Sequence, residues 1–145
     1  MSNTWVLVAE SSRAKIFRLN TITDSLEEIA DLAHTESRMH EHDLTTDLPG
    51  SRVGSGGSHH HYDERSDVKQ QEQLRFAKQV SEKLNKAWNN GEFSQLIVAC
   101  PPAFLGTLRK VFNANVTQSI VQEIDKNLIQ FTANQIMDHL EIYQT

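Results

Sequence analysis

The sequence predicts an α/β domain in which a mixed five-stranded sheet carries helices on both faces. Three observations predict this fold. The chain opens with two short apolar runs, continues with one long helix-periodic stretch, and then alternates strand-like runs with helical spacing. A chain of 145 residues has the length of one domain, so we expect residues 1–145 to share a single fold.

The first three predicted strands come from the N-terminal 34 residues. Residues 5–9 are apolar and rich in β-branched side chains, and residues 14–19 resume this character after a polar turn, which predicts a hairpin. Residues 25–34 are ambiguous, because their apolar positions lie three apart and their composition favours helix by propensity. We prefer a strand here, since a third strand completes a consistent sheet.

A loop and a long helix are expected next. Residues 35–65 show no periodicity and contain Pro49 and a glycine cluster, so they predict a loop. The helix is expected to start near Ser66 or Asp67, with Asp67 and Gln70 as a capping box, and to end before Gly91. Its apolar stripe consists of Leu74, Ala77, Val80, Leu84 and Trp88.

The second half alternates strands and helices. Residues 96–100 are apolar throughout, as in a central strand, and Pro101 and Pro102 open a helix that reaches residue 112. Residues 116–124 alternate apolar and polar side chains, which predicts a strand near a sheet edge, and a closing helix is expected at 132–142. The order β-β-β-α-β-α-β-α is that of the ribonuclease H-like fold. The expected core contains Leu7, Ile16, Phe76 or Ala77, Val80, Leu84, Ile97, Val98, Leu108 and Leu140.

Composition restricts the class of protein. The net charge of −5 argues against broad nonspecific binding to nucleic acid. No apolar run approaches the ~20 residues that span a bilayer, so we expect no membrane partner. The N-terminus lacks the basic start of a signal peptide, and the single cysteine, Cys100, forms no internal disulfide. A cytoplasmic location is the default expectation.

A glycine- and histidine-rich segment is the main candidate for function. Gly50, Gly54, Gly56 and Gly57 are four of the six glycines of the chain, and three histidines follow them. Such a density of glycine suits an exposed, flexible loop, which we place at about residues 36–64. The predicted binding residues are Arg52, Gly56, Gly57, Ser58, His59, His61, Tyr62, Arg65 and Arg75.

Three catalytic interpretations are weaker than a binding interpretation. The loop histidines lack the spacing of a rigid zinc or nickel site, so no metal and no cofactor is expected. A two-metal nuclease would need several carboxylates. Glu10 and Glu72 could supply two of them, but the predicted strand at residues 96–100 does not end in the third acidic residue that such a site needs. Cys100 is expected to be a buried structural thiol. No catalytic residue is therefore predicted.

Three segments together resemble a known bacterial family. They are residues 8–17 (Val-Ala-Glu-Ser-Ser-Arg-Ala-Lys-Ile-Phe), the glycine loop ending in His-His-Tyr, and Arg-Phe-Ala-Lys at residues 75–78. They resemble the proteins required for attachment to host cells, a family similar to the middle domain of eukaryotic and archaeal peptide release factors and of Pelota. In release factors the loop carries Gly-Gly-Gln, whereas here Ser58 follows Gly56 and Gly57.

The leading functional prediction follows from this resemblance. It is a non-enzymatic cytoplasmic binding protein related to translation release and rescue factors, acting at the ribosome or on RNA through the glycine-rich loop, without hydrolysing peptidyl-tRNA. The alternative is a host-attachment or surface-regulation factor that works through contacts with a protein partner. The third is an enzyme that acts on a small molecule through the loop histidines. A homo-oligomer is compatible with each of them.

Overall fold

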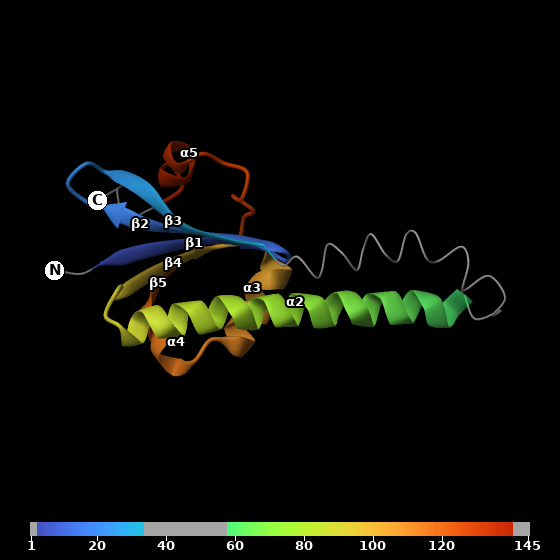
Figure 1. Cartoon of the computed structure of the whole chain (residues 1–145). Helices are drawn as coiled ribbons and strands as arrows, with labels where there is room; N and C mark the ends of the chain where they lie inside the picture. Colours follow the sequence, from blue (N-terminus) through green and yellow to red (C-terminus); the bar gives the residue numbers. More distant parts are fainter. Residues whose placement is uncertain (1–2, 34–57, 141–145) are drawn as a thin grey trace.

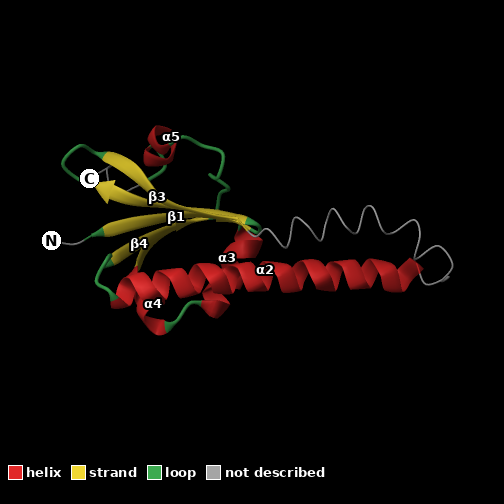
Figure 2. Cartoon of the chain, in the orientation of Figure 1, coloured by secondary structure: helices red, strands yellow, loops and turns green. Residues whose placement is uncertain are grey.

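The fold is a mixed α/β domain built on one five-stranded sheet (Figures 1 and 2). A computed structural model of the chain describes residues 3–33 and 58–140, with side chains described in 3–33 and 67–140. The strand order is β3-β2-β1-β4-β5. The predicted α/β class and mixed five-stranded sheet are confirmed.

The sheet combines an antiparallel half with a parallel half. Strands β1 (Thr4–Glu10), β2 (Arg13–Asn20) and β3 (Ser25–Ala33) form an antiparallel meander, which confirms the strand interpretation for residues 25–33. Strands β4 (Gln95–Ala99) and β5 (Ile120–Ile124) extend the sheet from β1, and all three run parallel. The carboxyl ends of β1, β4 and β5 therefore lie at one end of the sheet.

Each outer strand contains an irregularity that changes the face its side chains cover. The register of β2 with β3 shifts between Ile16 and Phe17, and that of β4 with β5 shifts between Leu96 and Ile97. Along β5, Ile120 packs against one core cluster and Ile124 against the other. A regular strand would point both side chains to the same face, because their positions differ by an even number.

Helix α2 (Ser58–Asn89) dominates the shape of the molecule. Its 32 residues correspond to about 48 Å, and its first half projects beyond the sheet (Figure 1). It ends as predicted at Gly91, where φ is +74° and the N–H donates to the carbonyl of Trp88 at 2.9 Å. The N–H of Glu92 donates to the carbonyl of Ala87, which completes a Schellman motif.

The predicted start of this helix near Ser66 or Asp67 is wrong. The helix begins at Ser58, so Asp67 and Gln70 lie inside it and do not cap it. Residues 58–66 contain neither glycine nor proline, and a helix that is already nucleated by packing extends through such residues at little cost. Residues 58–64, which were assigned to the loop, are therefore helical. The rest of the predicted loop lies outside the described residues.

The second half contains three more helices, and here two predictions need correction. Helix α3 (Pro102–Val111) lies where it was expected. Residues 116–124 are not one strand, because helix α4 (Ala114–Ser119) precedes β5. The side chain of Asn113 accepts a hydrogen bond from the Val116 N–H at 2.9 Å and caps that helix. The closing helix α5 (Ala133–Met137) is shorter than predicted.

Two apolar layers hold the sheet between them. Helices α2, α3 and α4 cover one face, and α5 with the segment before it covers the other (Figure 1). All the predicted core residues are buried, including both Phe76 and Ala77. The predicted stripe of α2 is only partly right, because Leu74 is 38% exposed and Trp88 is half-buried. No helix in the described ranges is long and apolar enough to cross a membrane.

Candidate functional site

The nine predicted binding residues fall into three groups. Outside the described residues lie Arg52, Gly56 and Gly57. Within the first turns of α2, where only the backbone is described, lie Ser58, His59, His61, Tyr62 and Arg65. Arg75 is the one predicted binding residue whose side chain is described.

Arg75 is the partner of a buried carboxylate. It lies where α2 meets the sheet, and its Nη1 is 2.8 Å from Oε1 of Glu72, one turn earlier. The Glu72 side chain is only 4% exposed, whereas that of Arg75 is 57% exposed. A buried carboxylate without a hydrogen-bonded cation would be strongly destabilising. The contact therefore gives Arg75 a structural role at the base of the projecting half of α2.

The carboxyl ends of the parallel strands form the edge where ligands of open α/β sheets usually bind. Glu10 ends β1, and its Oε2 accepts a hydrogen bond from Asn127 Nδ2 at 3.2 Å. Arg13 lies opposite Glu10 in the register of β1 and β2, and its side chain makes a two-point contact with Asp31 of β3, with Nη2 to Oδ2 at 3.1 Å.

Cys100 follows β4 at the same carboxyl end of the sheet. Its side chain is fully buried, and its N–H donates to the carbonyl of Ile124 at 3.0 Å. Burial, and to a lesser degree the negative charge of Glu123, raises the pKa of Cys100 to about 12, although Arg109 acts in the opposite direction. The thiol is therefore protonated at neutral pH, which makes it a poor nucleophile.

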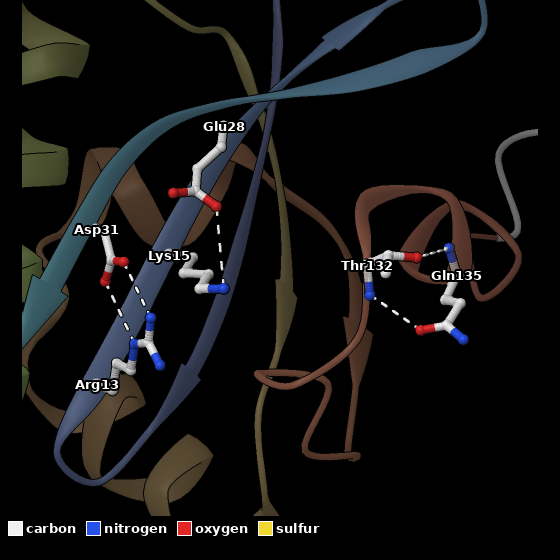
Figure 3. A network of polar contacts seen from close by, with 6 residues as sticks. All are labelled: Arg13, Lys15, Glu28, Asp31, Thr132 and Gln135. Carbon is white, nitrogen blue, oxygen red and sulfur yellow. Dashed lines mark hydrogen bonds and ion pairs between the residues drawn. The ribbon is translucent and has the colours of Figure 1, made fainter.

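Strands β2 and β3 carry a row of paired charges (Figure 3). Nζ of Lys15 lies 3.9 Å from Oε1 of Glu28, and Arg18 forms an ion pair with Glu27, which is directly opposite on β3. The hydrogen bond and charge of Asp31 raise the pKa of Arg13. These cations face carboxylates of the neighbouring strand, so this part of the sheet presents both signs together and lacks the character of a phosphate-binding surface.

A shallow pocket of about 450 Å³ lies beside the outer strand β5. It is lined by Arg109, Phe112, Thr117, Ile120, Val121, Gln122 and Glu123. Arg109 of α3 and Glu123 of β5 form an ion pair beside it, with Nε to Oε2 at 3.3 Å and a second bond from Nη2 to Oε1. The hydrogen bond and charge of Glu123 raise the pKa of Arg109.

Within the part of the chain whose side chains are described, no group of three or more His, Cys, Asp or Glu side chains could hold a metal ion. The histidines at positions 34, 40, 42 and 59–61 lie outside this part of the chain.

Comparison with known proteins decides between the functional predictions. The family model described as "Protein required for attachment to host cells" matches residues 5–140. The chain belongs to this family. No curated protein matches the chain. The match covers β1 from Trp5, the other four strands and helices α2 to α5.

The leading prediction of a translation-related function is wrong. The family match groups the chain with proteins required for attachment to host cells, and nothing in it points to the ribosome, to RNA or to a peptide release factor. Five of the described cations, Arg13, Lys15, Arg18, Arg75 and Arg109, are paired with carboxylates. The resemblance to attachment proteins that the sequence indicated is confirmed.

Sequence reasoning missed the pocket beside β5. Four of its lining residues, Ile120 to Glu123, were assigned to a longer strand that began at Val116. The signal that could have found the correct boundary is Asn113, because asparagine before Ala-Asn-Val is a preferred helix N-cap. The ion pair of Arg109 and Glu123 joins residues 14 positions apart and follows only from the packing of α3 beside β5.

Proposed function

We propose that this protein contributes to the attachment of a cell to its host, and that it does so through contacts with a protein partner. The observation that carries the proposal is the family match, which spans residues 5–140 and so includes the whole described domain from β1 onward. A match of this extent refers to the function of the domain as a unit and does not reflect a shared short motif.

The chemistry of the described residues supports binding over catalysis. The thiol at the carboxyl end of β4 is held protonated, and the carboxylates near it are hydrogen-bonded or ion-paired. Val121 of β5 is 51% exposed and lines the pocket together with the charged side chains of Arg109 and Glu123. Exposed apolar side chains rimmed by charges are typical of surfaces that contact other proteins.

An adherence assay tests the proposal. The gene is deleted from the organism that encodes it, and attachment of the deletion strain to host cells is compared with that of the parent and of a complemented strain. We expect the deletion strain to attach less, and complementation to restore attachment. Unchanged attachment at equal growth would overturn the proposal.

The cellular location separates two forms of this function. We propose a cytoplasmic location, from which the protein would regulate the attachment surface through a partner inside the cell. Fractionation with an antibody against the native protein tests this location. Recovery in the cytoplasmic fraction supports regulation, whereas recovery on the cell surface would replace it with direct contact with the host.

We also propose that the domain has the ribonuclease H-like topology. The strand order β3-β2-β1-β4-β5, with β1, β4 and β5 parallel, supports this assignment. Superposition of an experimental structure on members of that fold tests it, and a different connection between β4 and β5 would refute it.

A further inference from the structure

The free edge of β5 is the starting point for a further inference about binding. Among the described residues, β5 has β4 on one side and no strand on the other. The carbonyl of Ile124 accepts a hydrogen bond from Cys100, so Ile124 directs its backbone groups toward β4. Backbone groups of successive residues in a strand alternate in direction, and Glu123 therefore directs its N–H and C=O away from the sheet.

The pocket runs along this free edge. Four consecutive residues of β5 line it, and its volume of about 450 Å³ lies within the ~300–1,000 Å³ range of ligand pockets. Its lining is more apolar than polar, and Val121 is half exposed beside it. An apolar side chain of a bound segment would thus find a cavity next to the backbone groups that the same segment could pair with.

Arg109 adds a charged feature to one side of the pocket. Its guanidinium has five N–H donors, of which Glu123 accepts two. The Arg109 side chain is 57% exposed, so its remaining donors are accessible. Guanidinium groups bind carboxylates through paired N–H donors, and a second carboxylate could therefore bind opposite Glu123.

We infer that the edge of β5 binds an extended peptide segment of a partner protein, with an apolar side chain in the pocket and a neighbouring carboxylate on Arg109. The peptide adds as a sixth strand whose backbone pairs with Glu123, while the pocket selects its side chains. This inference rests on the proposed function and specifies the class of partner. An extended peptide satisfies the outward backbone groups, the apolar cavity and the guanidinium together.

Three short peptides of known composition test the inference. They are acetyl-Thr-Val-Glu-Val-Thr-amide and its counterparts with Gln or Lys in place of Glu, titrated into the full-length protein and followed by ¹H–¹⁵N spectra. We expect shift changes at the amides of residues 120–124 and at Nε–H of Arg109, with slower exchange of the Glu123 N–H. The Gln peptide should bind about two- to fivefold more weakly, the range expected for an exposed ion pair.

A charge exchange provides a sharper test. The double variant Arg109→Glu with Glu123→Arg keeps an ion pair beside the pocket but places the cation on β5, and we expect it to lose the preference for the Glu peptide over the Lys peptide. The matched control exchanges Arg18 and Glu27, an exposed pair on β2 and β3. We expect the control variant to bind the Glu peptide as the natural protein does.

Several outcomes would overturn the inference. These are shift changes that lie away from β5, equal affinities for the three peptides, or an unchanged preference in the double variant. Concentration-dependent shifts at residues 120–124 without peptide would assign the edge to a second copy of the chain instead. Each of these results leaves the attachment role standing, because that role depends on the deletion strain. Conversely, normal attachment of the deletion strain would overturn the attachment role, whereas a peptide site measured on β5 would still stand.

Discussion

At the scale of single residues, burial decides the chemistry of the groups that the sequence singled out. Cys100 lies at the carboxyl end of a parallel strand, where reactive groups are often found, but its side chain is fully buried. Glu72 is almost equally buried, and Arg75 reaches it from the neighbouring turn of α2. Cys100 and Glu72 are therefore structural in the described domain, and neither side chain is exposed to a substrate.

The raised pKa of Cys100 predicts an alkaline loss of stability. The folded protein keeps the thiol proton up to a pKa of about 12, whereas an unfolded chain releases it near its ordinary value of 9.0. The folded state thus binds more protons between these values, and stability falls as pH rises through this window, by up to about 1.4 kcal/mol per pH unit.

Denaturant unfolding between pH 8 and 12 measures this effect. We expect the natural protein to lose more stability over the window than Cys100→Ala, in which the other alkaline groups still titrate. In addition, the thiol should resist a thiol reagent at pH 8 until the protein is unfolded. Equal pH profiles for the two proteins would contradict the assignment of a buried, protonated thiol.

The contact between Glu72 and Arg75 predicts that replacing Arg75 alone destabilises the protein more than replacing both residues together. Arg75→Gln removes a cation that is hydrogen-bonded to a buried carboxylate, and we expect a loss of about 1–2 kcal/mol, moderated by the exposure of the Arg75 side chain. Replacing both residues by leucine removes the charge together with its partner and should cost less. Urea unfolding of the two variants measures the difference, and a double variant less stable than Arg75→Gln would count against a buried charge.

At the scale of elements, the sequence predicts those whose local pattern agrees with their packing. The apolar run of β4 is buried throughout, and the proline at the start of α3 and the glycine after α2 mark real helix ends. Residues 25–33 form a strand against their helix propensity, because pairing with β2 outweighs a weak local preference. Propensity alone would have removed this strand from the sheet.

The elements that the sequence did not predict correctly are helix α4 and the start of β5, where the pattern of apolar residues is compatible with both a helix and a strand. Residues 116, 120 and 124 are spaced by four, which suits a helix, while the polar residues between them suggested a strand. The chain uses both, with Val116 buried in α4 and Ile124 packed in the second cluster. The pocket beside β5 depends on this boundary and could not be predicted without it.

The N-cap of α4 provides a test at this scale. Asn113→Ala removes the acceptor for the Val116 N–H and the donor to Oδ1 of Asn85, and should destabilise the protein by about 1 kcal/mol or more, whereas Asn113→Asp keeps only the acceptor and should recover part of the loss. Thermal unfolding followed by circular dichroism measures both variants. Equal stability of Asn113→Ala and the natural protein would indicate that residues 114–119 are not a capped helix.

At the scale of the whole molecule, the sheet is stable only when both of its faces are covered. Leu84 of α2 and Ile136 of α5 are fully buried in clusters on opposite faces. Strand β1 contributes to both clusters, with Leu7 on one face and Val8 on the other. We therefore expect the two layers to unfold together as one cooperative unit.

Truncation of one residue in each layer tests this expectation. Leu84→Ala and Ile136→Ala should each cost about 2–5 kcal/mol, and their effects should add to within about 0.5 kcal/mol because the sites do not touch. The controls Leu74→Ala and Ile22→Ala change side chains that are 38% and 87% exposed and should cost much less. A separate unfolding transition in Ile136→Ala would show that α5 forms an independent layer.

The two irregular outer strands have a consequence for behaviour at high concentration. Open sheet edges are sites at which identical chains can stack without limit into fibrils. The register shifts between Ile16 and Phe17 and between Leu96 and Ile97 interrupt regular pairing at both margins of the sheet. A short segment can still bind beside Glu123, but a regular ladder with another copy would be interrupted at these positions. The shifts that move side chains between the two layers thus also act against polymerisation through the edges of the sheet.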